Sequence, residues 1–200
     1  MTERVEQGRI EIPADALVLL VGASGSGKTS LAARLLSTDA VLSSDALRGV
    51  VSGDPANQVA SGPAFRILHA QAARRLADGR LTVIDATNIA AAARRPLLRL
   101  AAAHRRPAIA LVLDLPAATC LERNAARAGR VVPEAAVRRQ LADLRRALDR
   151  GDLDDEGFER VVVLTDSDAV DGTTVGLTKP AATATLSVPP SLRRTRRQDP

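Results

Sequence analysis

Aromatic side chains are nearly absent from this 200-residue chain, which has two phenylalanines, Phe65 and Phe158, and neither tryptophan nor tyrosine. With 46% apolar residues the chain still has enough material for one full core, which we expect to consist of Ala, Leu and Val. The same absence excludes stacking on Tyr or Trp as the means of holding a nucleobase or a single strand. Stacking on arginine is left open.

Cysteine is almost absent too: Cys120 is the single one, so a disulfide partner within the chain is excluded. Its place in a helical pattern predicts a small core residue. The chain also lacks a signal-peptide pattern and an apolar run long enough to span a bilayer. We therefore expect a cytoplasmic protein with no membrane partner. The composition gives no indication of its oligomeric state.

Lysine is scarce as well, since only Lys28 and Lys179 stand against 26 arginines. The formal net charge is +5, of which residues 171–200 carry +3 and residues 1–170 only +2. The body of the chain is thus nearly neutral. Any surface that binds nucleic acid must therefore be a local one.

One of the two lysines lies in a glycine-rich motif. The stretch Gly22-Ala-Ser-Gly-Ser-Gly-Lys28-Thr29 fits the phosphate-loop pattern G-x-x-x-x-G-K-[ST], in which backbone N–H groups wrap nucleotide phosphates and the lysine reaches the β- and γ-oxygens. An ammonium suits this task because it is a compact point charge, whereas a guanidinium is a broad fork. An apolar run precedes the motif and a helical pattern follows it, as an anion site between a strand and a helix requires. The predicted ATP-binding residues are Gly22, Ala23, Ser24, Gly25, Ser26, Gly27, Lys28, Thr29 and Ser30.

Apolar runs of strand length alternate with helical patterns along the chain. We predict strands at 16–21, 40–42, 81–84, 108–113 and 161–164, and helices at 31–36, 63–78, 91–104, 116–128 and 133–149. This alternation favours an α/β fold of the P-loop NTPase type, a parallel five-stranded sheet with helices on both faces and a helical lid. We place this domain at 1–170. Residues 171–200, which are rich in Pro and Thr and have a basic end, are expected to form a disordered tail.

Two side chains are candidates for holding magnesium. Thr29 follows the loop lysine, which places its hydroxyl to ligate Mg²⁺; the alternative is a first-turn threonine without a metal. Asp85 ends a predicted strand, where a second carboxylate would support the metal or its waters. Alternatively, Asp85 is a turn residue that binds its own backbone together with Thr87 and Asn88.

A third acid, Asp45, lies just past the second predicted strand, at the sheet edge where ligands bind. There it could accept a proton from an acceptor hydroxyl that attacks the γ-phosphate of ATP. It could equally cap a helix, since Ser44-Asp45 precedes a helical pattern. Arg48 lies one turn further on and would hold a phosphate of the acceptor, or else be a surface arginine.

Three arginines, Arg123, Arg127 and Arg130, are spaced four and three residues apart, so on a helix they share one face. Clustered guanidiniums could form a lid over the triphosphate and stabilise the charge of the phosphoryl transition state. A solvated basic face is the alternative. Gly129 is placed to end the helix.

Four segments are specific enough to compare with a known family. They are Gly22-Ala-Ser-Gly-Ser-Gly-Lys-Thr29, Val41-Leu-Ser-Ser-Asp-Ala-Leu-Arg-Gly-Val-Val51, Leu81-Thr-Val-Ile-Asp-Ala-Thr-Asn88 and Glu122-Arg-Asn-Ala-Ala-Arg127. Through them, residues 12–165 resemble the kinase domain of bacterial polynucleotide kinase-phosphatases, an AAA-type ATP-binding domain. The resemblance implies an ATP- and Mg²⁺-dependent kinase whose substrate is a nucleic acid 5′-hydroxyl end.

The resemblance also implies roles for single residues. Asp45 corresponds to the general base toward the 5′-hydroxyl, and Arg48 to the arginine that contacts the phosphate of the acceptor. Arg123 and Arg130, with Arg127 between them, correspond to lid arginines that grip the donor phosphates.

Two other functions stay open. A kinase of the same fold could phosphorylate a small hydroxylated metabolite or an antibiotic, which the weak charge of residues 1–170 and the lack of aromatics favour. A protein that binds ATP as a switch, without a phosphate acceptor, is the third hypothesis.

Overall fold

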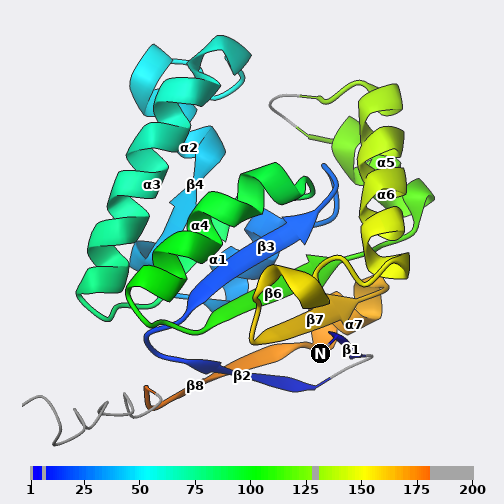
Figure 1. The fold of residues 1–200 in the computed structure, drawn as a ribbon. Coiled ribbons are helices and arrows are strands. Elements are labelled where there is room, and N and C mark those ends of the chain that lie inside the picture. The colour runs from blue at the N-terminus through cyan, green and yellow to red at the C-terminus, as the bar shows by residue number, and fades with distance from the viewer. Residues whose placement is uncertain (1, 6–7, 128–130, 181–200) are drawn as a thin grey trace, which may run out of the picture.

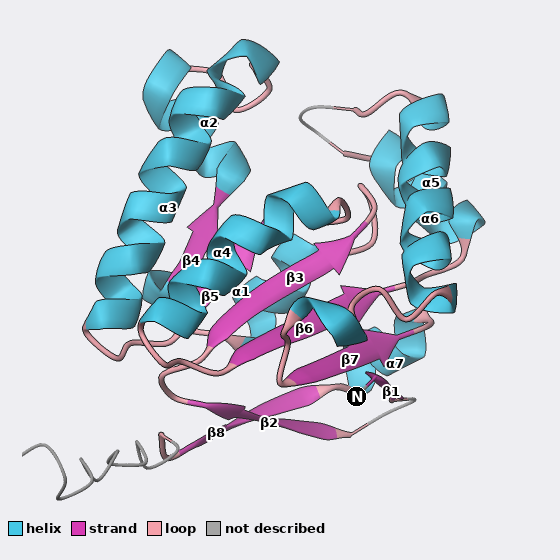
Figure 2. Cartoon of the chain, in the orientation of Figure 1, coloured by secondary structure: helices cyan, strands magenta, loops and turns pink. Residues whose placement is uncertain are grey.

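The structure, a computed structural model, describes residues 2–5, 8–127 and 131–180. Their elements form the α/β fold that the sequence predicts (Figures 1 and 2). The central sheet is parallel throughout, with the strand order β1-β7-β6-β3-β5-β4. Its strands are β1 (Thr2–Arg4), β3 (Leu17–Gly22), β4 (Val41–Ser43), β5 (Thr82–Asp85), β6 (Ala108–Leu113) and β7 (Arg160–Leu164).

The five predicted strands are all present, and β1 adds a sixth that sequence reasoning does not find. β1 has three residues and no apolar run, so nothing in its own composition indicates a strand. Its place comes from pairing with β7, where Thr2 lies opposite Val161. Arg160 Nε also donates a hydrogen bond of 2.8 Å to Glu3 Oε1 across this pair.

Helices cover both faces of the sheet. They are α1 (Lys28–Leu35), α2 (Ser44–Ser52), α3 (Ser61–Ala77), α4 (Ala91–Ala103), α5 (Ala117–Ala125), α6 (Glu134–Asp149) and α7 (Ser167–Gly172), with 3-10 turns η1 (Thr38–Ala40), η2 (Gln58–Ala60) and η3 (Asp154–Glu156). One face of the sheet packs on α3, α4 and α6 through Leu68, Leu97 and Leu144. The other face packs on α1 through Ala32. No helix in the described part of the chain is both long enough and apolar enough to cross a membrane.

A second, two-stranded parallel sheet lies below the central one in Figure 1, formed by β2 (Arg9–Pro13) and β8 (Thr174–Thr178). Ile10 and Ile12 are fully buried in the same core cluster as α1, and Val175 packs against this cluster. The predicted boundary at 170/171 is therefore wrong, because β8 belongs to the folded domain. The composition of β8 resembles that of a disordered tail. Its pairing with β2 and the packing of Val175 against the core nevertheless give it a defined structure. Residues 181–200, the rest of the predicted tail, lie outside the described residues.

Candidate active site

The carboxyl ends of three neighbouring strands bring the predicted site residues together. Ser43 lies opposite Asp85 in the β4–β5 pair, and Leu20 lies opposite Asp85 in the β3–β5 pair. Two residues after Leu20, the chain leaves β3 and enters the phosphate loop. The phosphate loop, Asp85 and the start of α2 therefore share one edge of the sheet, as expected for a ligand site in a parallel α/β sheet.

The phosphate loop wraps around the side chain of its own lysine. Lys28 Nζ donates hydrogen bonds to the carbonyl oxygens of Gly22 (2.9 Å) and Ala23 (2.8 Å), and it lies 3.4 Å from Ser26 Oγ. Burial lowers the pKa of this ammonium to about 8, although the carboxylate of Asp85 acts in the opposite direction. The charge is thus held in a dry position, where its interaction with an anion is strong.

Helix α1 begins at Lys28, and Gly27 precedes it with a left-handed φ of 94° and no side-chain cap. The first N–H groups of the helix are therefore left for a ligand rather than for a capping side chain. Ser24 N donates a hydrogen bond of 2.8 Å to Gln140 Oε1, which fixes the loop against α6. This contact comes from a residue that the sequence does not single out.

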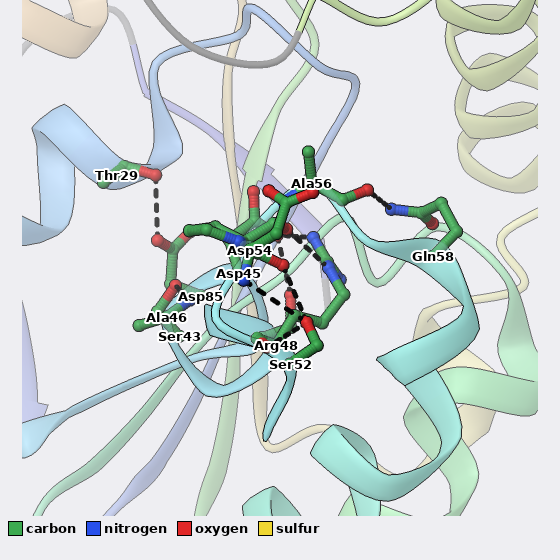
Figure 3. A network of polar contacts seen from close by, with 12 residues as sticks. Thr29, Ser43, Asp45, Ala46, Arg48, Ser52, Asp54, Ala56, Gln58 and Asp85 are labelled. Atoms are coloured by element: carbon green, nitrogen blue, oxygen red, sulfur yellow. Dashed lines mark hydrogen bonds and ion pairs between the residues drawn. The ribbon is translucent and has the colours of Figure 1, made fainter. Parts of the chain in front are cut away.

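Thr29 and Asp85, the two predicted magnesium residues, are in direct contact. Thr29 Oγ1 donates a hydrogen bond of 2.8 Å to Asp85 Oδ2 (Figure 3). Burial raises the pKa of the Asp85 carboxyl, while the Thr29 hydrogen bond and the Lys28 charge lower it. Within the described part of the chain, the hydrogen bond that Asp85 accepts comes from Thr29 and not from its own backbone. The described residues include no group of three or more His, Cys, Asp or Glu side chains that could hold a metal ion.

A hydroxyl and one carboxylate side by side fit Mg²⁺, which usually takes one or two protein oxygens and completes its shell with waters and substrate phosphates. The donor set at Thr29 and Asp85 contains oxygen atoms alone, as this hard cation prefers. It would not suit a softer metal, which favours nitrogen or sulfur ligands.

Asp45 lies in the first turn of α2, and its carboxylate points along the helix to Arg48 (Figure 3). Arg48 Nη2 donates a hydrogen bond to Asp45 Oδ1, and Ser44 Oγ lies 3.2 Å from the same oxygen. The cap of α2 is Ser43, whose Oγ accepts from Ala46 N, so Asp45 is not the capping residue. Its side chain is half exposed and lines a cavity.

Arg48 is almost fully buried, at 5% exposure, and is not a surface arginine. Its Nε donates a hydrogen bond of 2.9 Å to the carbonyl oxygen of Pro55, seven residues further on. This contact holds the guanidinium between the α2–η2 loop and Asp45. Arg48 is thus a fixed cation on the cavity wall.

The predicted helix at 116–128 is shorter than expected, because α5 ends at Ala125. Arg123 lies on this helix and Arg127 beyond its end, so the arginines do not share one helical face as the spacing predicts. Both nevertheless line the cavity. A Cβ on Gly27 would lie 3.5 Å from Arg123 Nη1, and Arg123 Nη2 donates a hydrogen bond of 3.0 Å to Ser167 Oγ. Arg130, the third predicted arginine, lies outside the described residues, and so does Gly129.

One cavity of about 620 Å³ joins these groups. At one end it is walled by α2, η2 and α3, through Asp45, Arg48, Gln58, Ser61 and Phe65. In the middle lie the phosphate loop, Thr29 and Asp85. The other end is lined by a set that sequence reasoning does not find: Arg34, Val132, Gln140, Val170 and Asp171.

The missed residues had little signal of their own. Phe65 is one of two aromatics, but it lies in an ordinary amphipathic helix. Arg34 is six residues past Lys28, and its guanidinium donates to the carbonyl oxygens of Val170 and Thr173, which only the folded chain brings near. Asp171 falls in the segment expected to be a tail.

A family model for the AAA domain matches residues 17–150 of this chain. Among solved structures, the Pnkp1/Rnl/Hen1 RNA repair complex has a similar chain, with a TM-score of 0.59 and 19% identity. The match covers 70% of this chain and 47% of that chain, so it spans about half of that chain's length.

A putative kinase from Chloroflexus aurantiacus is also similar, with a TM-score of 0.52, 18% identity, and 76% of this chain and 88% of that chain covered. A gluconokinase from Sinorhizobium meliloti gives a TM-score of 0.48 at 21% identity, over 80% and 93% of the two chains. At these identities the first two likenesses, with TM-scores of 0.59 and 0.52, show a common fold. No curated protein matches the chain.

Proposed function

Because the chain belongs to the AAA domain family, we propose that it is a kinase that transfers the γ-phosphate of ATP to a polynucleotide 5′-hydroxyl. The observation that carries the proposal is the single cavity in which the Asp45–Arg48 pair lies across from the phosphate loop. A carboxylate and a fixed guanidinium at one end, and a loop for phosphates in the middle, match the needs of an acceptor and a donor. The motif resemblance to polynucleotide kinases adds the class of acceptor.

The donor phosphates are held by the loop N–H groups and by Lys28, which exchanges its carbonyl partners for phosphate oxygens. Arg123 and Arg127 face the same space and neutralise the charge that spreads over the transferred group. Thr29 and Asp85 would hold Mg²⁺, which supplies charge compensation at the β- and γ-phosphates. The base of the nucleotide extends away from Asp45, toward Val170 and Asp171.

On the acceptor side, Asp45 accepts the proton of the hydroxyl as its oxygen forms a bond to the γ-phosphorus. The bond between that phosphorus and the β–γ bridging oxygen breaks, and ADP leaves with the electron pair. Arg48 holds a phosphate of the acceptor and, through its hydrogen bond to Asp45 Oδ1, fixes the orientation of the carboxylate.

The test is transfer of labelled γ-phosphate from ATP to a short oligonucleotide with a 5′-hydroxyl, with a 5′-phosphorylated strand as the control substrate. Asp45→Asn should lower kcat by roughly 100- to 10,000-fold, the usual contribution of general base catalysis, with the Kd for ATP unchanged. Asp54→Asn is the matched control, because Asp54 is an exposed carboxylate in the adjoining loop and is not part of the cavity wall. An equal loss of ATP binding and of transfer in Asp45→Asn would contradict the base assignment.

A specific observation favours a second candidate, a kinase of a small hydroxylated metabolite. Arg48 is the one cation among the described residues that line the acceptor end of the cavity. A polynucleotide held there through one phosphate would show a shallow salt dependence, with a slope of about −0.7 in log affinity against log salt. Labelling of neither RNA nor DNA 5′-hydroxyl strands, with slow ATP hydrolysis intact, would move the assignment to a metabolite.

The third hypothesis, an ATP-binding switch, predicts slow hydrolysis with no acceptor at all. Deletion of residues 171–200 would not test this hypothesis, because it removes β8 together with residues 181–200. A deletion of 181–200 leaves β8 in place. Loss of function with intact ATP binding in this shorter deletion would favour the switch over the kinase.

A further inference from the structure

A buried ion pair lies behind the loop that follows Asp85 but takes no part in the chemistry proposed above. The contact between Thr29 and Asp85 is called the Thr29–Asp85 corner. Arg94, on α4, is 1% exposed, and Glu156, in η3, is 10% exposed at its side chain. Arg94 Nε donates a hydrogen bond of 2.6 Å to Glu156 Oε2, and Nη2 donates to Oε1, so the pair is bidentate. Such a pair is costly to bury and adds stability only when every donor is satisfied.

The Nη1 group of the guanidinium donates to the loop that follows β5. Arg94 Nη1 donates to the carbonyl oxygen of Asn88 at 2.8 Å and to that of Ile89. Asn88 has a left-handed φ of 48°, which a residue other than glycine seldom adopts. The guanidinium therefore supports a left-handed turn of the backbone three residues after Asp85.

The same loop is fastened to the phosphate loop. Gly22 N donates a hydrogen bond of 3.0 Å to the carbonyl oxygen of Thr87, and Asn88 Nδ2 donates one of 2.8 Å to that of Leu20. These contacts join the loop after β5 to the end of β3. A continuous series of polar contacts thus runs from Glu156 through Arg94 and Asn88 to the phosphate loop.

We propose that the Arg94–Glu156 pair positions Asp85 and the phosphate loop relative to each other, and thereby sets the affinity of the Thr29–Asp85 corner for Mg²⁺–nucleotide. This inference rests on the proposed function, because it takes Asp85 to act on the metal. Arg94 and Glu156 are positioning residues, since neither lines the cavity. Replacing a residue that orients a metal ligand without binding the metal itself typically changes the metal affinity by roughly 10- to 100-fold.

The chain offers a matched control. Arg106 Nη1 donates a hydrogen bond of 2.7 Å to Asp15 Oδ2, and Asp15 is 3% exposed. Arg106 also binds a backbone carbonyl, that of Leu76. This second arginine–carboxylate pair is partly buried, with Arg106 22% exposed at its side chain, and a single hydrogen bond joins it. It precedes β3 and β6 and so lies at the opposite edge of the sheet.

The experiment compares Glu156→Gln with Asp15→Asn. Binding of a fluorescent ATP analogue is measured with Mg²⁺ and with EDTA, without any acceptor, and amide hydrogen exchange is followed at residues 86–90. We expect Glu156→Gln to raise the Mg²⁺ concentration for half-maximal binding about tenfold and to speed exchange in that loop. Asp15→Asn should lower the unfolding midpoint but leave the Mg²⁺ dependence within about twofold of wild type.

If both variants lower the unfolding midpoint and neither changes the Mg²⁺ dependence, the pair is structural only and the proposal is wrong. Should Glu156→Gln not fold, the double variant Arg94→Met/Glu156→Leu replaces the pair by apolar groups, a change that often preserves stability. The double variant removes both contacts to the Asn88 and Ile89 carbonyls. We therefore expect the same increase in the Mg²⁺ concentration for half-maximal binding. If the wild-type protein binds the ATP analogue equally well with and without Mg²⁺, the metal assignment in the proposed function is wrong. If only the oligonucleotide labelling fails, the inference about Arg94 and Glu156 is unaffected.

Discussion

Gly25 and Cys120 are in backbone contact: a Cβ atom added to Gly25 would lie 2.1 Å from the carbonyl oxygen of Cys120. Gly25 also has a left-handed φ of 82°. The phosphate loop therefore rests directly on α5, with no room for a side chain between them. The requirement for glycine here comes from packing against a distant helix as well as from the turn itself.

Gly25→Ala is expected to push the phosphate loop away from α5 and to abolish ATP binding, because both the clash and the φ angle oppose a Cβ. The measurement is the Kd for ATP by calorimetry, together with the free energy of unfolding. Gly53→Ala is the control: Gly53 has a φ of 75°, but its Cβ would meet nothing within 4 Å. That variant should lose about 1 kcal/mol of stability and bind ATP normally. Normal ATP binding by Gly25→Ala would show that the loop does not need this contact.

The lowered pKa of Lys28 predicts that the free energy of unfolding increases with pH. Burial lowers its pKa to about 8 in the folded protein from 10.5, so between these values the unfolded chain holds more protons than the folded one. The free energy of unfolding should therefore rise as the pH increases from about 8 to 10.5, by about 3 kcal/mol for this group. Burial raises the pKa of Cys120, which acts in the opposite sense above pH 9.

The difference between wild type and Lys28→Met isolates the lysine, since Cys120 is common to both. Denaturant unfolding at several pH values is the measurement, and parallel curves for the two proteins would contradict the prediction. Bound triphosphate should restore the ammonium, so ATP binding near pH 8.5 should take up a proton in wild type and none in the variant. Calorimetry in two buffers of different ionisation enthalpy measures this uptake.

The position of Asp171 predicts a preference between GTP and ATP as the phosphate donor. Its carboxylate lines the end of the cavity away from Asp45 and can only accept hydrogen bonds. Guanine offers two neighbouring N–H donors to such a group, whereas adenine offers one amino group. Asp171→Asn should lower the ratio of kcat/KM for GTP to that for ATP by about tenfold, since an amide matches the donor and acceptor of adenine. Competition between the two nucleotides measures the ratio, and an unchanged ratio would place the base elsewhere.

Strands β3, β5, β6 and β7 can be predicted from the sequence because each is a largely apolar run that is buried on both sides. The edge strand β4 is partly exposed and is predicted from its short apolar run alone. β1, β2 and β8 cannot be predicted, since they are partly exposed and lack a continuous apolar run, and each depends on a partner about 160 residues away in sequence. The helix α2 is suggested only weakly, because Gly49, Val50 and Val51 lower its helical propensity. Its stability comes from packing against α3.

Within the site, the residues that belong to local motifs could be named from the sequence, and the structure places Lys28, Thr29 and Asp85 in one cavity. Their roles stay predictions. The burial of Arg48 could not be foreseen, because it depends on a carbonyl oxygen in the following loop. The pair of Arg94 and Glu156 is 62 residues apart, and each looks like a surface charge in sequence. A wrong helix end also misplaced Arg127 relative to Arg123.

The pairing of β2 with β8 has a consequence for how the protein is made. During synthesis at about 5–20 residues per second, β8 follows β2 by roughly 10–30 s. Over that interval Ile10 and Ile12, fully buried in the finished domain, have no partner strand, so the nascent chain presents them to chaperones and to other chains. The helix α7, which carries Val170 and Asp171, is translated just before β8. The nucleotide site therefore matures as one of the last parts of the domain, and ribosome-bound intermediates should acquire ATP affinity only after α7 and β8 have been synthesised.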